Sequence, residues 1–146
     1  MTNEDTLRIK RNNGLLGQCD PVFRRKMAAI LADLEGHGLK PRVQESWRSL
    51  TRQRTLQQQG FTQLTWSFHN AKNAQGQPAA LAVDLVDDEH PLQSPTRFLL
   101  MLASSARAHG CETGILWGLT KKQRNEELAD IFAFLFWQSG VKGYTP

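Results

Sequence analysis

Apolar residues recur at intervals of three and four along several stretches of the chain, the spacing that places them on one face of a helix. One stretch starts at Asp20-Pro21, a pair typical of a helix start because aspartate caps free N–H groups and proline suits the first helical position. The pattern predicts helices over about residues 20–36, 49–60, 94–110 and 120–139. The last contains the apolar segment 128–137, which is too short to span a bilayer, a task for about 20 helical residues. We expect this segment to be buried or to bind a partner.

Strand-like patterns lie between these predicted helices. Val43, Glu45 and Trp47 stand at alternate positions, which suggests a strand, and an apolar run with one embedded charge extends from Ala79 to Asp87. A further short strand is expected over residues 113–117. The chain shows no repeats and no low-complexity linker. These patterns predict an α+β fold, with a single domain over residues 1–146 and a small antiparallel sheet flanked by helices.

Composition narrows the class of protein. The chain has 146 residues, of which 40% are hydrophobic, as in soluble globular proteins. No basic segment followed by an apolar one comes after Met1, so we expect synthesis in the cytoplasm without a secretion signal, and no stable membrane insertion. Cys19 and Cys111 are far apart and are expected to be reduced.

The chain is basic, with a formal net charge of +4, which suits an acidic partner. The basic residues are scattered, and they are not interleaved with aromatic residues in a recognisable nucleic-acid-binding motif. We therefore interpret the basic clusters as solvated helix faces and expect no nucleic-acid partner.

His69 and Asp84 are the strongest candidates for chemistry. Asp84 interrupts the apolar run 81–86, where a buried carboxylate needs a cation, several N–H donors or a metal ion. His69 lies upstream in a polar segment, and histidine nitrogen and carboxylate oxygen are both common zinc ligands. The alternative is structural, with an aspartate that caps a turn and a solvated histidine.

The order of motifs from residue 47 to residue 84 resembles that of a known family. The chain reads Trp47-Arg48-Ser49, a short helix with Gln53, Gly60, then Ser67-Phe68-His69 and Ala82-Val83-Asp84. This order resembles the zinc peptidases that cut bacterial cell-wall peptides. They are the D-alanyl-D-alanine carboxypeptidases and L-alanyl-D-glutamate endopeptidases (VanY-like), which include many phage endolysins.

The resemblance implies roles for five residues. His69 and Asp84 would bind one zinc ion, and Ser67 would hold the loop that carries His69. Arg48 would be the catalytic arginine, which clamps a substrate carboxylate or polarises the scissile carbonyl. Gln53 would lie in the same cleft.

Each of the weaker assignments has a structural alternative. Arg48 could instead form an ion pair with Asp87 or Glu45, and Gln53 could be a solvated helix residue. Two nearby tryptophans, at positions 47 and 66, are expected to pack at the core and rim rather than to bind substrate.

The sequence departs from the family's pattern in two places. The family reads Ser-x-His-x-x-Gly-x-Ala-x-Asp, whereas here the polar insertion 70–78 puts Asp84 fifteen positions after His69. Closing a longer loop of this kind costs less than about 1 kcal/mol. The family's third ligand is a histidine near the C-terminus, in an Asp/Glu-x-x-His pattern whose acid is the general base. Neither His90 nor His109, the two histidines after Asp84, stands in that pattern.

We therefore expect that the domain lacks its C-terminal catalytic tail, and that a chain ending at Pro146 binds zinc weakly and cleaves little. The implied function is that of a zinc-dependent peptidase acting on peptidoglycan stem peptides. The enzyme would be phage- or prophage-encoded, like an endolysin, and would act on the cell wall. The alternative is a degenerate, non-catalytic binding protein or phage structural protein on the same scaffold.

Overall fold

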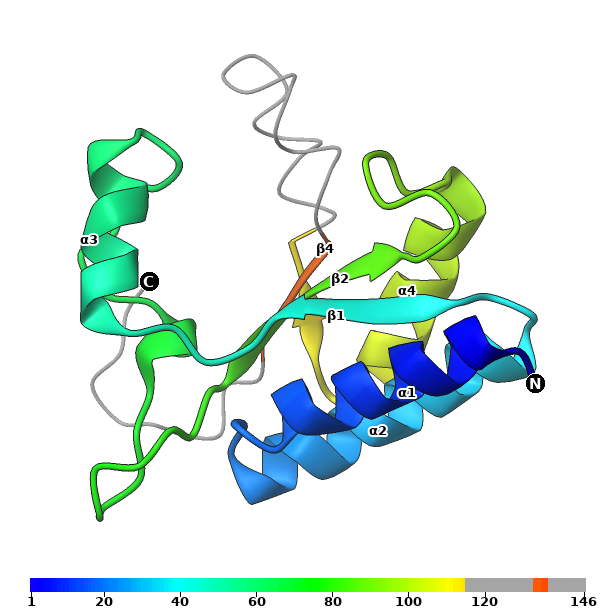
Figure 1. The fold of residues 1–146 in the computed structure, drawn as a ribbon, viewed down its shortest axis with the longest axis horizontal. Helices are drawn as coiled ribbons and strands as arrows, with labels where there is room; N and C mark the ends of the chain where they lie inside the picture. The colour runs from blue at the N-terminus through cyan, green and yellow to red at the C-terminus, as the bar shows by residue number, and fades with distance from the viewer. Residues whose placement is uncertain (115–132, 137–146) are drawn as a thin grey trace.

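The computed structural model describes residues 1–114 and 133–136 of the chain. Figure 1 shows helices gathered beside a small sheet, with the helix over residues 50–58 apart from them at the other end. The elements in chain order are α1 (Asn3–Leu16), α2 (Pro21–Gly36), β1 (Pro41–Glu45), α3 (Leu50–Gln58), the short 3-10 helix η1 (Phe68–Asn70), β2 (Ala82–Asp87), α4 (Thr96–Ala108), β3 (Glu112–Thr113) and β4 (Ala133–Phe136).

The four strands form one antiparallel sheet in the order β1-β2-β4-β3. Strand β2 is therefore hydrogen-bonded on both sides. Its Asp84 lies opposite Glu45 of β1, beside an irregularity in the pairing, and opposite Phe134 of β4. The predicted α+β class, with an antiparallel sheet flanked by helices, is confirmed.

The hydrophobic core lies between the sheet and helices α2 and α4. Helix α2 starts as predicted, because the Asp20 carboxylate accepts hydrogen bonds from the N–H groups of Val22 and Phe23. The side chains that fill the core are fully buried and come from both helices and from β1 and β2: Phe23, Met27, Ile30, Leu34, Val43, Val83, Leu85, Phe98 and Leu102. This packing makes β2 a rigid base for Asp84.

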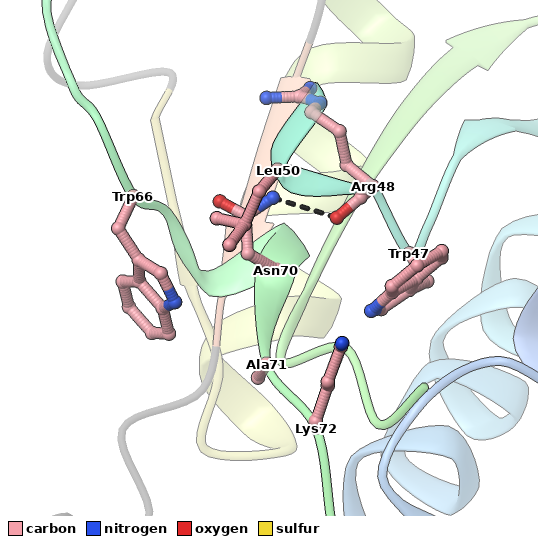
Figure 2. A pocket seen from close by; sticks show the side chains of 7 residues that line it. All are labelled: Trp47, Arg48, Leu50, Trp66, Asn70, Ala71 and Lys72. Atoms are coloured by element: carbon pink, nitrogen blue, oxygen red, sulfur yellow. Dashed lines mark hydrogen bonds between the residues drawn. The ribbon is translucent and has the colours of Figure 1, made fainter. Parts of the chain in front are cut away.

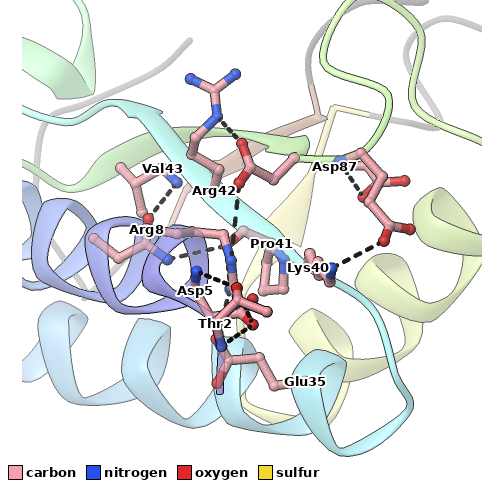
Figure 3. Close-up of polar contacts among 12 residues, drawn as sticks. Thr2, Asp5, Arg8, Glu35, Lys40, Pro41, Arg42, Val43 and Asp87 are labelled. Atoms are coloured by element: carbon pink, nitrogen blue, oxygen red, sulfur yellow. Dashed lines mark hydrogen bonds and ion pairs between the residues drawn. The ribbon is translucent and has the colours of Figure 1, made fainter.

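Helix α1 covers the outer edge of β1 and was not predicted. The buried side chain of Asn12 donates to the Pro41 carbonyl (2.9 Å) and accepts from the Val43 N–H (2.8 Å), so it replaces a neighbouring strand. The buried Arg8 guanidinium donates to Glu35 (2.8 Å) and Asp5 (3.1 Å) (Figure 3). These polar contacts protect an exposed sheet edge from pairing with another chain.

The predicted helix over residues 120–139 is wrong at Ala133–Phe136, which form strand β4; its other residues lie outside those described. Aromatic residues favour strands, and β4 pairs with both β2 and β3, so tertiary pairing outweighs the local helical pattern. Both cysteines are free, in keeping with the expectation that they are reduced, and both are buried. Within the described ranges, no helix has the length and apolar character required to cross a bilayer.

Candidate metal centre

The loop of residues 70–78 folds back on itself like a hairpin, so His69 and Asp84 lie close together despite their separation in the sequence. Residues 70–78 leave η1 and return through an isolated antiparallel bridge between Lys72 and Pro78. The Asn73 carboxamide oxygen accepts from two N–H groups inside the turn, and Gly76 adopts a positive φ of 76° that glycine tolerates best. At the base of the excursion, the Leu81 N–H donates to the Phe68 carbonyl (3.0 Å). The insertion therefore extends the loop without separating its two ends.

Ser67 and Asn70 hold the short helix that carries His69. The Ser67 hydroxyl accepts from the His69 N–H (3.3 Å), and the Asn70 carboxamide accepts from the Ser67 N–H (2.7 Å). Asn70 also donates to the carbonyl of Arg48 at 2.7 Å (Figure 2), and the Arg48 N–H donates to the His69 carbonyl at 2.8 Å. Ser67 thus holds this loop through its hydroxyl, while its role beside a metal ligand stays a prediction.

The His69 imidazole is oriented by a carbonyl and directed at a carboxylate. Its Nδ1 lies 2.6 Å from the carbonyl oxygen of Ser46, and its Nε2 lies 3.5 Å from Oδ1 of Asp84. A carbonyl only accepts hydrogen bonds, so Nδ1 carries a proton. In neutral His69, Nε2 is then the basic nitrogen, which is the form that binds metal ions. The His69 side chain is only 2% exposed, and that of Asp84 is 14% exposed.

Arg48 lies beside the same carboxylate, and all of its guanidinium nitrogens are engaged. Its Nε and Nη2 contact the Glu45 carboxylate at 3.1 and 2.7 Å, and its Nη1 donates to the Gln53 side chain at 2.9 Å. Its Nη2 also lies 3.6 Å from Oδ2 of Asp84. Arg48 therefore lies near His69 and Asp84, while its role as a catalytic residue stays a prediction. Of the two ion-pair partners that the sequence analysis considered for Arg48, Glu45 forms the pair and Asp87 does not.

Gln53 is fully buried and is not a solvated helix residue. Its carboxamide accepts from Arg48 and donates to the Leu64 carbonyl at 2.8 Å, so it joins the arginine to the loop after α3. Gln53 therefore fixes the position of Arg48 rather than facing an open cleft.

A second group of potential ligands lies at the other end of β2. Within the described residues, three or more ligand atoms converge only at Asp87, Glu89 and His90, all within 4.8 Å of one another. Neither His69 nor Asp84 belongs to that group. Asp87 accepts from the Glu89 N–H (3.2 Å) and pairs with His90 Nδ1 (3.0 Å), while Glu89 pairs with Lys40 (3.1 Å). These contacts indicate that the three residues stabilise a tight turn.

Other residues at the centre were missed in the sequence. Ser46 orients His69 through its main-chain carbonyl, which no side-chain motif reveals. Glu45 was considered as a partner of Arg48, but its position opposite Asp84 follows only from the pairing of β1 with β2. Asn70 had a readable signal, since Ser67 and Asn70 have the spacing of a capping box at the start of a helix.

Comparison with known proteins supports the architecture. No model of a known protein family matches the chain, and no curated protein matches it. Among solved structures, it is similar to the L-Ala D-Glu endopeptidase ChiX of Serratia marcescens, with a TM-score of 0.57, 21% sequence identity and 86% of each chain covered. The chain therefore shares the fold of that endopeptidase over most of its length.

Proposed function

We propose that this chain is a zinc-dependent peptidase that hydrolyses peptide bonds of bacterial peptidoglycan, with His69 and Asp84 as two ligands of one zinc ion. One observation carries the proposal, the 3.5 Å separation of His69 Nε2 and Asp84 Oδ1. Two ligands of a tetrahedral zinc ion, each bonded at about 2.1 Å, lie about 3.4 Å from each other. The two atoms are thus spaced as a zinc ion requires.

The residues around this pair fit a metal ligand set. The Ser46 carbonyl fixes the imidazole so that its basic nitrogen faces Asp84, a common arrangement for a histidine ligand. Asp84 is held on a rigid strand and keeps one oxygen toward His69 and the other toward Arg48. The fold of an L-Ala D-Glu endopeptidase and the motif order in the sequence favour a cell-wall peptide as substrate.

When bound, zinc would polarise the scissile carbonyl and activate a water molecule. The chain's own residues set up that chemistry. Arg48 orients the Asp84 carboxylate and offsets part of its charge, and Glu45 and Gln53 hold Arg48 in place. Within residues 1–114 and 133–136, no third histidine, cysteine or acid completes a ligand set with His69 and Asp84. The proposal therefore assigns no residue to the third ligand or to the general base.

We further propose an endolysin-like role, in which the enzyme reaches the cell wall as part of phage or prophage lysis.

A cleavage assay tests the peptidase activity. The chain, extended through any natural C-terminal continuation of its reading frame, is incubated with purified peptidoglycan and zinc, and newly freed amino groups are measured. We expect release that falls more than about 100-fold in His69→Ala, since losing even an outer partner of a metal ligand costs up to that factor.

His90→Ala is the matched control, because it removes a histidine from the other potential ligand group. Its rate should equal that of the unaltered chain. If the extended chain releases no peptide and retains no zinc, the protein is a non-catalytic binding or structural protein on this scaffold.

A further inference from the structure

A cavity of about 220 Å³ lies next to the loop that carries His69. Its walls include Trp47, Leu50, Trp66 and Lys72, and Figure 2 shows Trp47 and Trp66 on opposite sides of it with Lys72 at one edge. Asn70, which follows His69 directly, also lines the cavity. A peptide bound across the metal centre would therefore have a neighbouring residue within reach of this cavity.

The cation available in this cavity is Lys72 rather than Arg48. The Arg48 guanidinium is engaged by Glu45, Gln53 and Asp84, and Figure 2 shows it directed away from the cavity. The Lys72 ammonium group lies 5.9 Å from the centre of the Trp47 ring and is paired with no carboxylate of the described residues. Lys72 is also exposed, so an incoming anion can reach it.

Trp47 supplies a hydrogen-bond donor next to that cation. Its Nε1 is buried and has no acceptor among the residues that the structure describes. In Figure 2 this nitrogen lies on the edge of the indole that faces Lys72. A buried N–H without an acceptor is unfavourable, and an anionic oxygen placed between the indole and the ammonium group would satisfy it.

The opposite side of the cavity is apolar. Leu50 is 47% exposed and Trp66 is 36% exposed, so both present open hydrophobic surface. A peptide residue with a carboxylate, next to a residue with an apolar side chain, would complement both sides. This combination of charge and apolar surface would favour an acidic peptide.

We propose that this cavity binds a carboxylate of the peptide substrate through Lys72 Nζ and Trp47 Nε1–H, with Leu50 and Trp66 contacting the adjoining apolar residue. The proposal rests on the proposed peptidase function and deepens it, since it moves carboxylate recognition from Arg48 to Lys72. It also gives Trp47 and Trp66 a part in binding in addition to the packing role expected from the sequence.

Nuclear magnetic resonance of the tryptophan indole N–H groups tests this site without relying on catalysis. The full chain is titrated with acetyl-L-alanyl-D-glutamyl-L-alanine amide, and separately with the peptide that carries D-glutamine instead. Trp47→Phe identifies the Trp47 signal. We expect this signal to move downfield with the acidic peptide, and the D-glutamine peptide to bind about tenfold more weakly.

Lys72→Gln should remove the preference for the acidic peptide. Lys10→Gln is the matched control, because it makes the same charge change on an exposed position of α1 and should preserve the preference. The proposal is overturned if neither peptide binds, if both bind equally, if the Trp47 signal does not respond, or if Lys72→Gln keeps the preference. Peptide release from peptidoglycan is measured separately, so loss of this site and loss of the peptidase function are distinguishable.

Discussion

Replacing Arg48 with methionine tests whether Asp84 needs a cation beside it. The change keeps an unbranched side chain but removes two contacts with Glu45 at 2.7 and 3.1 Å and one with Gln53 at 2.9 Å. A hydrogen bond that involves a charged group contributes about 1.5–3 kcal/mol. The side chains of Arg48 and Glu45 are 10% and 25% exposed, so solvent screens part of this. We expect the free energy of unfolding to fall by about 3 kcal/mol in the presence of a chelator.

Zinc should reduce the loss of unfolding free energy that Arg48→Met causes. The Arg48 guanidinium lies 3.6 Å from Asp84 and repels a cation bound there, so Arg48→Met should bind zinc more tightly. A ligand at one hundred times its dissociation constant stabilises a protein by about 2.7 kcal/mol, and tighter binding adds to this. We expect zinc to narrow the difference between the variant and the unaltered chain by about 1 kcal/mol.

Urea unfolding with zinc and with chelator measures both quantities. Arg52→Met is the matched control, because Arg52 also contacts Glu45 but is 53% exposed and lies 3.8 Å away. Arg52→Met should lower the free energy of unfolding by less than about 0.5 kcal/mol with or without zinc. Two results would contradict a stabilising role of Arg48 beside Asp84. One is a loss of unfolding free energy in Arg48→Met no larger than that in Arg52→Met, and the other is a difference between Arg48→Met and the unaltered chain that zinc does not change.

Three further predictions concern the scaffold. Asn12→Ala removes the only side-chain acceptor of the buried Val43 N–H among the described residues, and should lower the free energy of unfolding by about 2–3 kcal/mol in urea titrations. The Ser105 hydroxyl, and then His109, hold the pKa of Asp33 below its usual value. This stability is present above the unfolded pKa of about 4 and is lost as the pH falls, so Ser105→Ala should lose less stability between pH 5 and pH 3 than the unaltered chain does. Burial raises the pKa of Cys19 to about 12, so mass spectrometry should find it unalkylated by iodoacetamide at pH 8 until the chain unfolds; equal labelling in both states would contradict this.

The helices and strands with strong local signals could be predicted from the sequence. Asp20-Pro21 marked the start of α2, and the apolar run around Asp84 marked β2. Helix α1 was missed because it is mostly polar and is held by Arg8 and Asn12 rather than by an apolar face. Its Thr2 and Asp5 form a capping box, a signal that was present in the sequence.

Only those residues of the site whose side-chain chemistry is distinctive could be predicted from the sequence. His69 and Asp84 stood out by chemistry, and the structure brings them together, while their role as metal ligands stays a prediction. The contact of the Ser46 carbonyl with His69 and the position of Glu45 opposite Asp84 depend on main-chain geometry and strand pairing, which sequence patterns do not contain. Strand β4 was read as a helix for the same reason, because its pairing with β2 is a long-range contact.

Zinc affinity shows whether His69 and Asp84 hold a metal ion. Isothermal titration of zinc into the unaltered chain, His69→Ala and His90→Ala compares the proposed centre with the group formed by Asp87, Glu89 and His90. We expect one zinc ion per chain, at least tenfold weaker binding in His69→Ala, and unchanged binding in His90→Ala. Unchanged binding in His69→Ala together with loss in His90→Ala would contradict this expectation and place the metal at the other end of β2.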